Sequence, residues 1–203
     1  RVAAVRLGDG SRLSCGAVVN AAGPRARGVA AMAGVDIPVF PRKRQVHVFD
    51  CRSRIDGLPL TICPNGVYVR PESGRYICGV APDPADDPDT LDLEADESLF
   101  EAVVWPTLAE RIPAFEAIRR TGGWAGHYAM NTFDHNALVG ALPERPNLYL
   151  ANGFSGHGMQ QSPAVGRAVA ELIVHGRFVT LDLDAFSPAR IAAGRPVREL
   201  AVV

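Results

Sequence analysis

Lysine is almost absent from this 203-residue sequence: Lys43 is the only one, and arginine supplies the rest of the basic charge. Twenty-one basic residues stand against 22 acidic residues, which leaves a net charge of −1. No basic patch is interleaved with aromatic residues, so nucleic acid and anionic membrane surfaces are excluded as expected partners. No apolar run approaches the roughly 18 residues that a membrane-spanning helix needs. We therefore expect a globular protein without a membrane span.

Paired cysteines and metal-binding spacings are also lacking. The four cysteines form no C-x-x-C pair, which predicts free thiols in a reducing compartment, the cytoplasm, and no zinc site. The acidic stretch 92–97 lacks the spacing of a calcium loop, and acids before a helix are explained by the helix dipole. We predict a solvated loop there and no metal site.

Three nucleotide and nucleophile motifs are missing as well. The sequence has no G-x-x-x-x-G-K-[ST] phosphate loop and no G-x-G-x-x-G dinucleotide fingerprint. The serine-hydrolase elbow begins at Gly153 but fails, because His157 stands where its second glycine is required. What is present instead is "NLYLANGFSGHGMQQSPAVGRAVAELIVHG", residues 147–176. Its pattern predicts a short strand, a glycine-rich bend and an amphipathic helix that begins near Met159 or Ser162.

The order of the other elements predicts two kinds of architecture. Asp9-Gly10 predicts a hairpin, residues 17–19 a strand buried on both faces, and residues 25–33 a helix. Residues 37–81 read as antiparallel strands, and a later helix is expected to kink or split at Pro106. We predict an α/β fold, with residues 1–36 and 136–203 in one domain and an antiparallel-sheet domain, residues 37–135, inserted into it.

The glycine-rich bend has two interpretations. The first N–H groups of a helix have no partner inside the helix, and the helix dipole favours negative charge at that end. Glycines there allow a ligand to approach the backbone closely. "GFSGHG" could therefore form a backbone cradle for a ligand, or it could be a glycine-rich turn that binds nothing.

A family resemblance bears on this choice. "GAVVNAAGP", "GVYVRPESGRYICG" and "GFSGHGMQQSPAVGRAVAELI" occur in this order, and together they resemble the C-terminal half of the D-amino-acid oxidase superfamily of FAD-dependent oxidoreductases. That superfamily includes glycine oxidase and the sarcosine oxidases. The resemblance implies a partial Rossmann-like FAD-binding domain that carries an antiparallel substrate domain. The N-terminal G-x-G-x-x-G unit of the family has no counterpart here, so we expect the isolated chain to bind FAD poorly or not at all.

The resemblance also places the cofactor, which is FAD. It implies that the glycine-rich segment faces the pyrimidine edge of the flavin, and that a small-residue segment lies alongside the cofactor. His127 falls where some relatives carry a flavin-linking cysteine, although a core or hydrogen-bonding histidine is the simpler interpretation. The implied cofactor-binding residues are Ala21, Ala22, Gly23, His127, Gly153, Phe154, Ser155, Gly156, His157, Gly158, Met159 and Gln160.

Substrate recognition is implied by position in the same way. In sarcosine oxidase-like relatives a lysine that helps to hold the substrate carboxylate stands where this sequence has the neutral Gln160. Another cation is then needed, and Arg44 and Arg70 are the candidates. Tyr68 shares a strand face with Arg70, and the pair suits a small carboxylate or amine, unless both face solvent.

Two histidines complete the candidate site. His157 is either a proton relay near the flavin or a side chain packed under the loop. His47 faces either the substrate cavity or solvent.

Two functions follow from the resemblance. The first is oxidation of a C–N bond in a small amine or amino acid by an FAD-dependent enzyme, whose missing N-terminal half is the expected partner of this segment. The alternative is a non-enzymatic flavoprotein that serves as an assembly or scaffold factor, which the neutral Gln160 favours. The sequence leaves the oligomeric state open.

Overall fold

A computed structural model describes residues 1–200, and its chain divides into two units. One unit consists of Arg1–Pro41 together with the segment from Tyr128 onward, and the other consists of Arg42–His127. The divisions fall inside two long strands, β4 (Val39–Cys51) and β8 (Ile118–Asn131). We refer to the two parts as unit 1 and unit 2. The assignment of the sequence-predicted segments to a cofactor and a substrate domain stays a prediction.

Unit 1 is built around a three-stranded sheet in the order β3-β10-β9, with β3 at Val18–Asn20, β10 at Arg145–Asn152 and β9 at Leu138–Leu142. β10 runs parallel to β3, with Leu150 opposite Asn20, and antiparallel to β9. The two parallel strands therefore end side by side at the same edge of the sheet.

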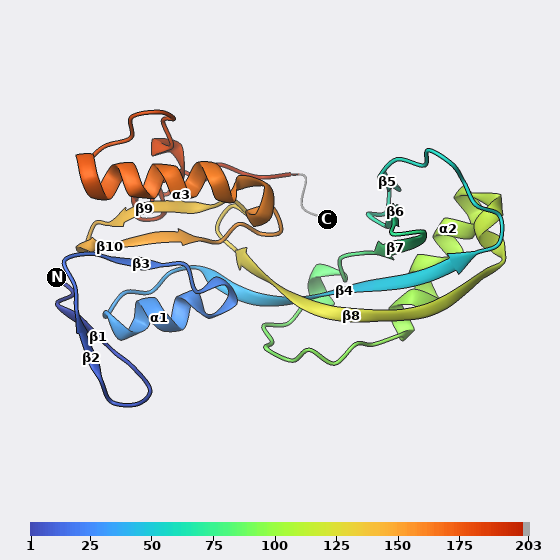
Figure 1. The fold of residues 1–203 in the computed structure, drawn as a ribbon, viewed down its shortest axis with the longest axis horizontal. Helices are drawn as coiled ribbons and strands as arrows, with labels where there is room; N and C mark the ends of the chain where they lie inside the picture. The colour runs from blue at the N-terminus through green and yellow to red at the C-terminus, as the bar shows by residue number, and fades with distance from the viewer. Residues whose placement is uncertain (201–203) are drawn as a thin grey trace. The chain divides into compact units, whose positions relative to one another are not determined.

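Helices cover both faces of this sheet (Figure 1). Helix α1 (Ala26–Met32) packs its Ala26 and Ala30 against a cluster that contains Leu148 and Leu150. Helix α3 (Gly158–His175) packs on the other face, where its Val165 and Val169 meet Val139 and Ala137. Neighbouring strand residues point to opposite faces, so the alternation along β9 separates the two cores. The result is an α/β/α layering in unit 1.

The short elements of unit 1 largely follow the prediction, with one exception. The hairpin around Asp9-Gly10 forms between β1 (Ala4–Arg6) and β2 (Arg12–Ser14). The prediction that residues 17–19 are buried on both faces is wrong, because Val19 is 41% exposed. The reason is that β3 lies at the edge of its sheet and its Val18 packs on the α1 side only. The C-terminal part adds η5 (Asp184–Phe186) and α4 (Ala189–Ala192).

Unit 2 contains the antiparallel sheet that the sequence predicts. Its strand order is β5-β6-β7-β4-β8, with β5 at Thr61–Ile62, β6 at Tyr68–Glu72 and β7 at Arg75–Gly79. The aromatic rings of Phe49, Tyr76 and Phe115 form its core, with centroids 5.0 to 5.3 Å apart. Phe115 meets the other two rings edge to face, whereas Phe49 and Tyr76 are stacked, and aromatic pairs at this distance stabilise a core beyond the area they bury.

The helix with Pro106 shows how the chain accommodates a proline. A π-helical segment, η3 (Phe100–Val104), leads directly into α2 (Trp105–Arg111), and Pro106 lies in the first turn of α2. Proline is tolerated there, because its missing N–H would have no partner in a regular first turn. Short 3-10 turns complete the described secondary structure: η1 (Gly23–Arg25), η2 (Pro84–Asp86) and η4 (Pro113–Glu116).

Candidate functional site

Two loops leave the sheet of unit 1 at the ends of its parallel strands. Residues 21–23 follow β3, and residues 153–157 follow β10 and lead into α3. Loops at the carboxyl ends of adjacent parallel strands are where open α/β sheets bind their ligands. The structure therefore brings together the two segments that the family resemblance assigned to the cofactor, although they are 130 residues apart in the sequence.

A pair of buried asparagines ties the two loops together. Asn152, the last residue of β10, donates from its side-chain amide to the backbone oxygen of Asn20, the last residue of β3. Asn20 in turn accepts from the Ala22 N–H and donates to the Ala26 oxygen at 2.9 Å. The side chains of both asparagines are nearly inaccessible to solvent. Sequence reasoning missed this role, because an asparagine at a strand end reads as an ordinary turn signal.

The glycines of the second loop allow close packing within the protein itself. A Cβ on Gly156 would lie 2.6 Å from the ring of Tyr128, and one on Gly153 would lie 3.0 Å from Cβ of Asn131. Both glycines have positive φ angles, 106° and 68°, which other residues rarely adopt. The fold alone thus requires these two glycines, and close approach of a ligand is not needed to explain them.

Ser155 lies between these glycines in a strained conformation. Its φ of 49° is unusual for a residue other than glycine. Three hydrogen bonds hold it there: its N–H donates to the Ala129 oxygen, its hydroxyl donates to the Gly153 oxygen, and the hydroxyl accepts from the Asn131 N–H at 3.0 Å. Strain of this kind persists only where the surroundings over-determine the backbone.

The start of α3 offers free backbone donors. No side chain caps this N-terminus among the described residues, and its first turn contains no acidic residue. Gln161 is the first residue whose N–H bonds back to the carbonyl of His157, the N-cap residue. The N–H groups of Gly158, Met159 and Gln160 therefore have no partner from a preceding helical turn. The side chains of Met159 and Gln160 are exposed, and that of His157 is half-buried.

A buried ion pair lies in unit 1 and is connected to the glycine-rich loop through Asn131. The guanidinium of Arg190 binds the carboxylate of Asp134 through two hydrogen bonds of 2.8 and 3.0 Å, and both side chains are at most 4% exposed. Asp134 also accepts from the Val197 and Asn136 N–H groups and from the Asn131 amide. Burial alone would raise the pKa of Asp134, but the hydrogen bonds from Arg190 and Val197 outweigh it and lower the pKa below the usual value.

This network was only partly visible in the sequence. Asp134 lies in the turn after β8, and its sequence context is typical of a turn, but Arg190 lies in a polar, proline-containing tail that carries no motif. No local pattern pairs a residue with one 56 positions away, so only the fold could reveal the contact.

The four substrate-binding candidates lie in unit 2. Carboxylates of the same unit bind the two arginines among them. Both terminal nitrogens of Arg44 bind Asp87 at 2.8 Å, and both side chains are largely buried. Arg70 pairs with Glu72 on the same strand, at the surface. Tyr68 is half-buried and lies against Gly79, whose added Cβ would meet the phenol oxygen at 2.9 Å. Neither arginine is therefore a ready-made receptor for a substrate carboxylate.

His47 occupies neither of the positions that were predicted for it. It is 1% exposed and packs on Phe100 of η3, with ring centroids 5.1 Å apart. Both ring nitrogens are buried and find no hydrogen-bond partner among the described residues. Burial and the nearby Arg120 lower its pKa. The expectation of a cavity-facing or solvent-facing His47 is wrong, because the apolar residue Phe100 covers this face of β4.

His127 makes a hydrogen bond through Nε2 to the backbone oxygen of Asp92, at 3.0 Å. The bond anchors the acidic loop, which Lys43 also holds through Asp92 at 2.6 Å. Residues 92–97 are all exposed, so the prediction of a solvated loop is confirmed, and these two contacts tie the loop down at Asp92.

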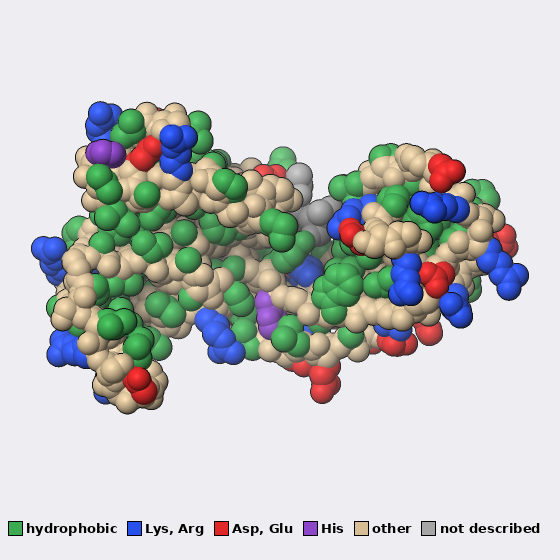
Figure 2. Space-filling model, in the orientation of Figure 1, with side chains coloured by type: hydrophobic (Ala, Val, Ile, Leu, Met, Phe, Trp, Pro, Cys, Tyr) green, Lys and Arg blue, Asp and Glu red, His purple; other side chains and the backbone are tan. Residues whose placement is uncertain are grey.

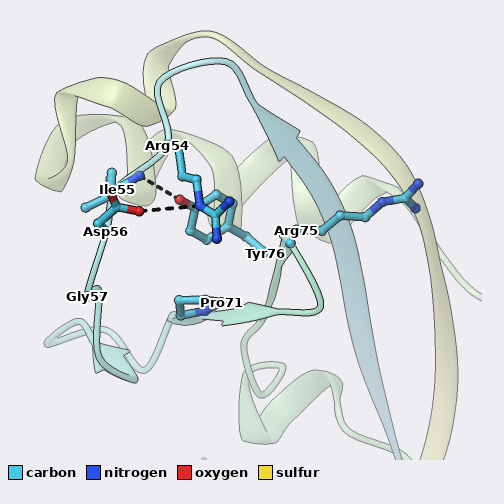
Figure 3. Close-up of a pocket in the computed structure, with 8 residues that line it drawn as sticks. Arg54, Ile55, Asp56, Gly57, Pro71, Arg75 and Tyr76 are labelled. Atoms are coloured by element: carbon cyan, nitrogen blue, oxygen red, sulfur yellow. Dashed lines mark hydrogen bonds and ion pairs between the residues drawn. The ribbon is translucent and has the colours of Figure 1, made fainter.

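Unit 2 also contains a small pocket beside the β6–β7 turn (Figure 3). Its polar groups bind one another: the Tyr76 hydroxyl accepts from the Ile55 N–H at 2.9 Å, and Arg54 pairs with Asp56. Arg75 extends away from the pocket, toward Asp50. None of the predicted site residues lines it.

The thiols and carboxylates of the described chain form no obvious metal site. Within residues 1–200 no three His, Cys, Asp or Glu side chains are gathered so that they could hold a metal ion. The four cysteines, Cys15, Cys51, Cys63 and Cys78, are free, and burial raises the pKa of Cys78 to about 12. No described helix combines the length and apolar character needed to span a bilayer.

Comparison with known proteins shows the family. The FAD-dependent oxidoreductase family (DAO) matches residues 1–172. This chain belongs to that family. FAD-dependent oxidoreductase domain-containing protein 1 of Xenopus laevis is 44% identical over 210 residues, which cover 96% of this chain and 42% of that protein. The glycine oxidase of Geobacillus kaustophilus is 29% identical over 89% of the chain. The predicted superfamily is confirmed.

Solved structures confirm the fold as well. L-proline dehydrogenase from P. horikoshii superposes with a TM-score of 0.83 and 31% identity, over 96% of this chain and 51% of that one. Glycine oxidase from Geobacillus kaustophilus gives 0.76 and 25% identity, over 91% and 48%. The chain spans about two fifths of the length of the curated relatives that it matches over most of its own length.

The donor set of unit 1 fits the flavin part of FAD. The first turn of α3 presents uncapped N–H groups with no acidic side chain beside them. Such groups suit the carbonyl oxygens and ring nitrogens of an isoalloxazine, which are electron-rich acceptors. An acidic first turn or a side-chain cap would have opposed this fit, and the described structure has neither.

Proposed function

We propose that the whole protein oxidises a C–N bond of a small amine or amino acid with FAD, and that the start of α3 holds the flavin. One observation carries this proposal: the uncapped N-terminus of an 18-residue helix follows a glycine-rich loop at the carboxyl end of a parallel strand. Family membership supplies the cofactor class. When bound, FAD supplies the two-electron oxidation itself.

The residues of this chain would supply binding and electrostatics. The N–H groups of Gly158, Met159 and Gln160 would donate to the pyrimidine edge of the flavin. Negative charge that develops there is favoured by the positive end of the helix dipole, so these donors stabilise the reduced cofactor more than the oxidised one. Residues 21–23 would lie along the cofactor, since Asn20 and Asn152 tie that loop to the glycine-rich loop.

The charges of the candidate residues provide no strong site for a substrate carboxylate within this chain. Arg44 and Arg70 are engaged by Asp87 and Glu72, and Gln160 is uncharged. The named relatives support the broad class, because they include a glycine oxidase, an L-proline dehydrogenase and a 4-methylaminobutanoate oxidase. His157 remains a candidate proton relay, since it is the N-cap residue of α3 and only half-buried.

The direct test is reduction of the bound flavin without oxygen. The purified whole protein would be mixed anaerobically with a panel of N-methyl amines, N-methyl amino acids, proline and D-amino acids, while flavin absorbance is followed. We expect at least one member of the panel to bleach the flavin within minutes. Stoichiometric FAD that no amine bleaches would contradict the oxidase proposal.

The same outcome would favour the second candidate function, a flavoprotein that assists assembly. The internal pairing of both candidate arginines is the observation that favours this alternative. The glycine oxidase of Geobacillus kaustophilus, mixed with glycine, serves as the positive control for the assay.

A further inference from the structure

We infer that the C-terminal segment, residues 184–197, positions the glycine-rich loop through a buried chain of hydrogen bonds from Arg190 to Ser155. This inference rests on the proposed function, since it assigns the loop to the cofactor. Arg190, Asp134 and Asn131 lie outside the loop and act on it through Ser155, so they are positioning residues.

The first link joins the C-terminal segment to the turn after β8. Arg190 binds Asp134 with two nitrogens, and its remaining donors reach the carbonyl oxygens of Phe186 and Asn136. Val197 adds its N–H to the same carboxylate at 2.9 Å. A buried carboxylate with this many donors is held in one position, because any displacement would leave buried polar atoms unpaired.

The second link joins that carboxylate to the glycine-rich loop. The side-chain amide of Asn131 donates to Asp134 at 2.8 Å, and the backbone N–H of the same residue donates to the Ser155 hydroxyl at 3.0 Å. Asn131 is fully buried, and Ser155 is 1% exposed. One residue thus transmits the position of Asp134 to the loop.

The third link fixes the shape of the loop. The Ser155 hydroxyl, placed by Asn131, donates to the Gly153 oxygen and holds Ser155 itself at its positive φ. Without this hydroxyl only the bond from the Ser155 N–H to the Ala129 oxygen would hold the strained backbone, which could then relax toward an ordinary conformation. Because residues 153–157 lead directly into α3, a relaxed loop would also move the N–H groups of Gly158 and Met159.

The position of Arg190 in the sequence makes the inference distinctive. The family match ends at residue 172, and Arg190 and Val197 lie beyond it. The family model thus does not include this segment, although relatives such as the Xenopus laevis protein match 96% of the chain.

The test measures FAD affinity and apoprotein stability separately in the whole protein. The variants are Arg190→Lys, which keeps the charge but loses the two-pronged geometry, and Ser155→Ala, which removes only the last link. We expect each to raise the FAD dissociation constant about tenfold, as measured by flavin fluorescence quenching.

Two matched controls lie outside the chain of hydrogen bonds. Arg145→Lys alters an arginine bound to the carbonyl oxygens of Ala33 and Glu144, and Ser162→Ala removes an exposed helix hydroxyl. We expect both controls to leave the FAD affinity within twofold of wild type, whatever they do to stability in urea.

The double variant Arg190→Lys/Ser155→Ala gives a readout that a purely structural role would not produce. If both residues act through one chain of contacts, the double variant binds FAD no more weakly than the weaker single variant. Additive losses, or variants that match their controls, would overturn the inference while the proposed function stands. A wild-type protein that binds no FAD would instead contradict the proposed function. If Arg190→Lys does not fold, Ser155→Ala against Ser162→Ala decides alone.

Discussion

Each unit of this protein contains an arginine that binds an aspartate through two hydrogen bonds, and the two pairs differ in what surrounds them. In unit 1 the Arg190–Asp134 pair is buried, and three further donors reach its carboxylate. In unit 2 the Arg44–Asp87 pair is 11% and 13% exposed, and it ties an acidic loop to β4. An arginine–aspartate pair can thus be the centre of a buried hydrogen-bond network, or it can attach a surface loop to a strand.

The difference extends to the rest of each unit. Acidic and basic side chains are mixed on the surface of unit 2 (Figure 2). Ion pairs such as Arg75–Asp50 and Arg119–Asp50 are exposed there. Exposed pairs of this kind contribute about 0 to 1 kcal/mol each. Removing one partner of a buried pair costs about 3 to 5 kcal/mol, because the other charge is left buried and alone. Position in the fold, and not the chemistry of the pair, sets the magnitude.

The largest expected effect tests this comparison directly. Asp134→Ala should lower the free energy of unfolding by about 3 to 5 kcal/mol, since it leaves the Arg190 guanidinium buried without its carboxylate. Asp87→Ala should lower it by less, about 1 to 3 kcal/mol, because the Arg44 and Asp87 side chains are 11% and 13% exposed and fewer donors depend on the Asp87 carboxylate. Urea unfolding of both variants measures the two values. Equal losses would show that burial does not distinguish the pairs.

The same pair predicts a dependence on pH. The folded-state pKa of Asp134 is lowered, so its contribution to stability is present above the unfolded-state pKa of about 3.9 and is lost as the pH falls through the folded-state value. Asp134→Asn should therefore show a shallower fall in stability below about pH 4 than wild type. Urea midpoints measured between pH 2 and 6 check this expectation.

The next effect concerns the glycine-rich loop. Gly156→Ala should lower the free energy of unfolding by about 1 to 3 kcal/mol, because its Cβ would overlap the Tyr128 ring and the φ of 106° disfavours any side chain. Measured against the Tyr128→Ala single variant, Gly156→Ala should cost only the backbone part, because the ring that its Cβ would overlap is gone. The measurement is urea unfolding of the apoprotein. A variant that binds FAD more weakly but keeps the wild-type apoprotein stability would show that Gly156 serves ligand binding only.

Gln160 sharpens the comparison of charges around the site. Gln160→Lys should tighten the binding of simple amino-acid carboxylates about tenfold, equivalent to about 1.4 kcal/mol, because it adds a positive charge beside the start of α3. The corresponding amides should gain nothing. Perturbation of flavin absorbance on titration with a carboxylate and its amide distinguishes the two. An equal response to both ligands would place Gln160 away from the substrate.

The smallest effect is a gain in unit 2. His47→Leu should raise the free energy of unfolding by about 1 kcal/mol at pH 7.5, since it replaces a buried ring with two unpartnered nitrogens by an apolar side chain. The pKa of His47 is lowered in the fold, so wild-type stability should fall as the pH drops below about 6.5 and the unfolded chain binds a proton first. The variant should lose that slope. A variant with an unchanged slope would assign the titration to another group.

Much of the local structure was readable in the sequence, because it depends on neighbouring residues. The hairpin at Asp9-Gly10, helix α1 and the antiparallel strands of unit 2 follow from turn residues and from period-2 or period-3.6 patterns. The glycine-rich bend and the helix after it were located correctly for the same reason. The three family motifs also lie in continuous stretches, so the family and its cofactor class could be predicted without a structure.

What only the tertiary structure decided are contacts between residues far apart in the sequence. No periodicity reveals that Arg190 binds Asp134, that Asn152 ties Asn20, or that the Tyr128 ring occupies the space a Cβ on Gly156 would need. The alternation of residues around His47 likewise predicted that its strand has two different faces. Only the position of η3 determined that Phe100 covers the His47 side chain. Burial and partner choice depend on which elements pack together, and that information resides in the three-dimensional arrangement of the chain and not in any local stretch of it.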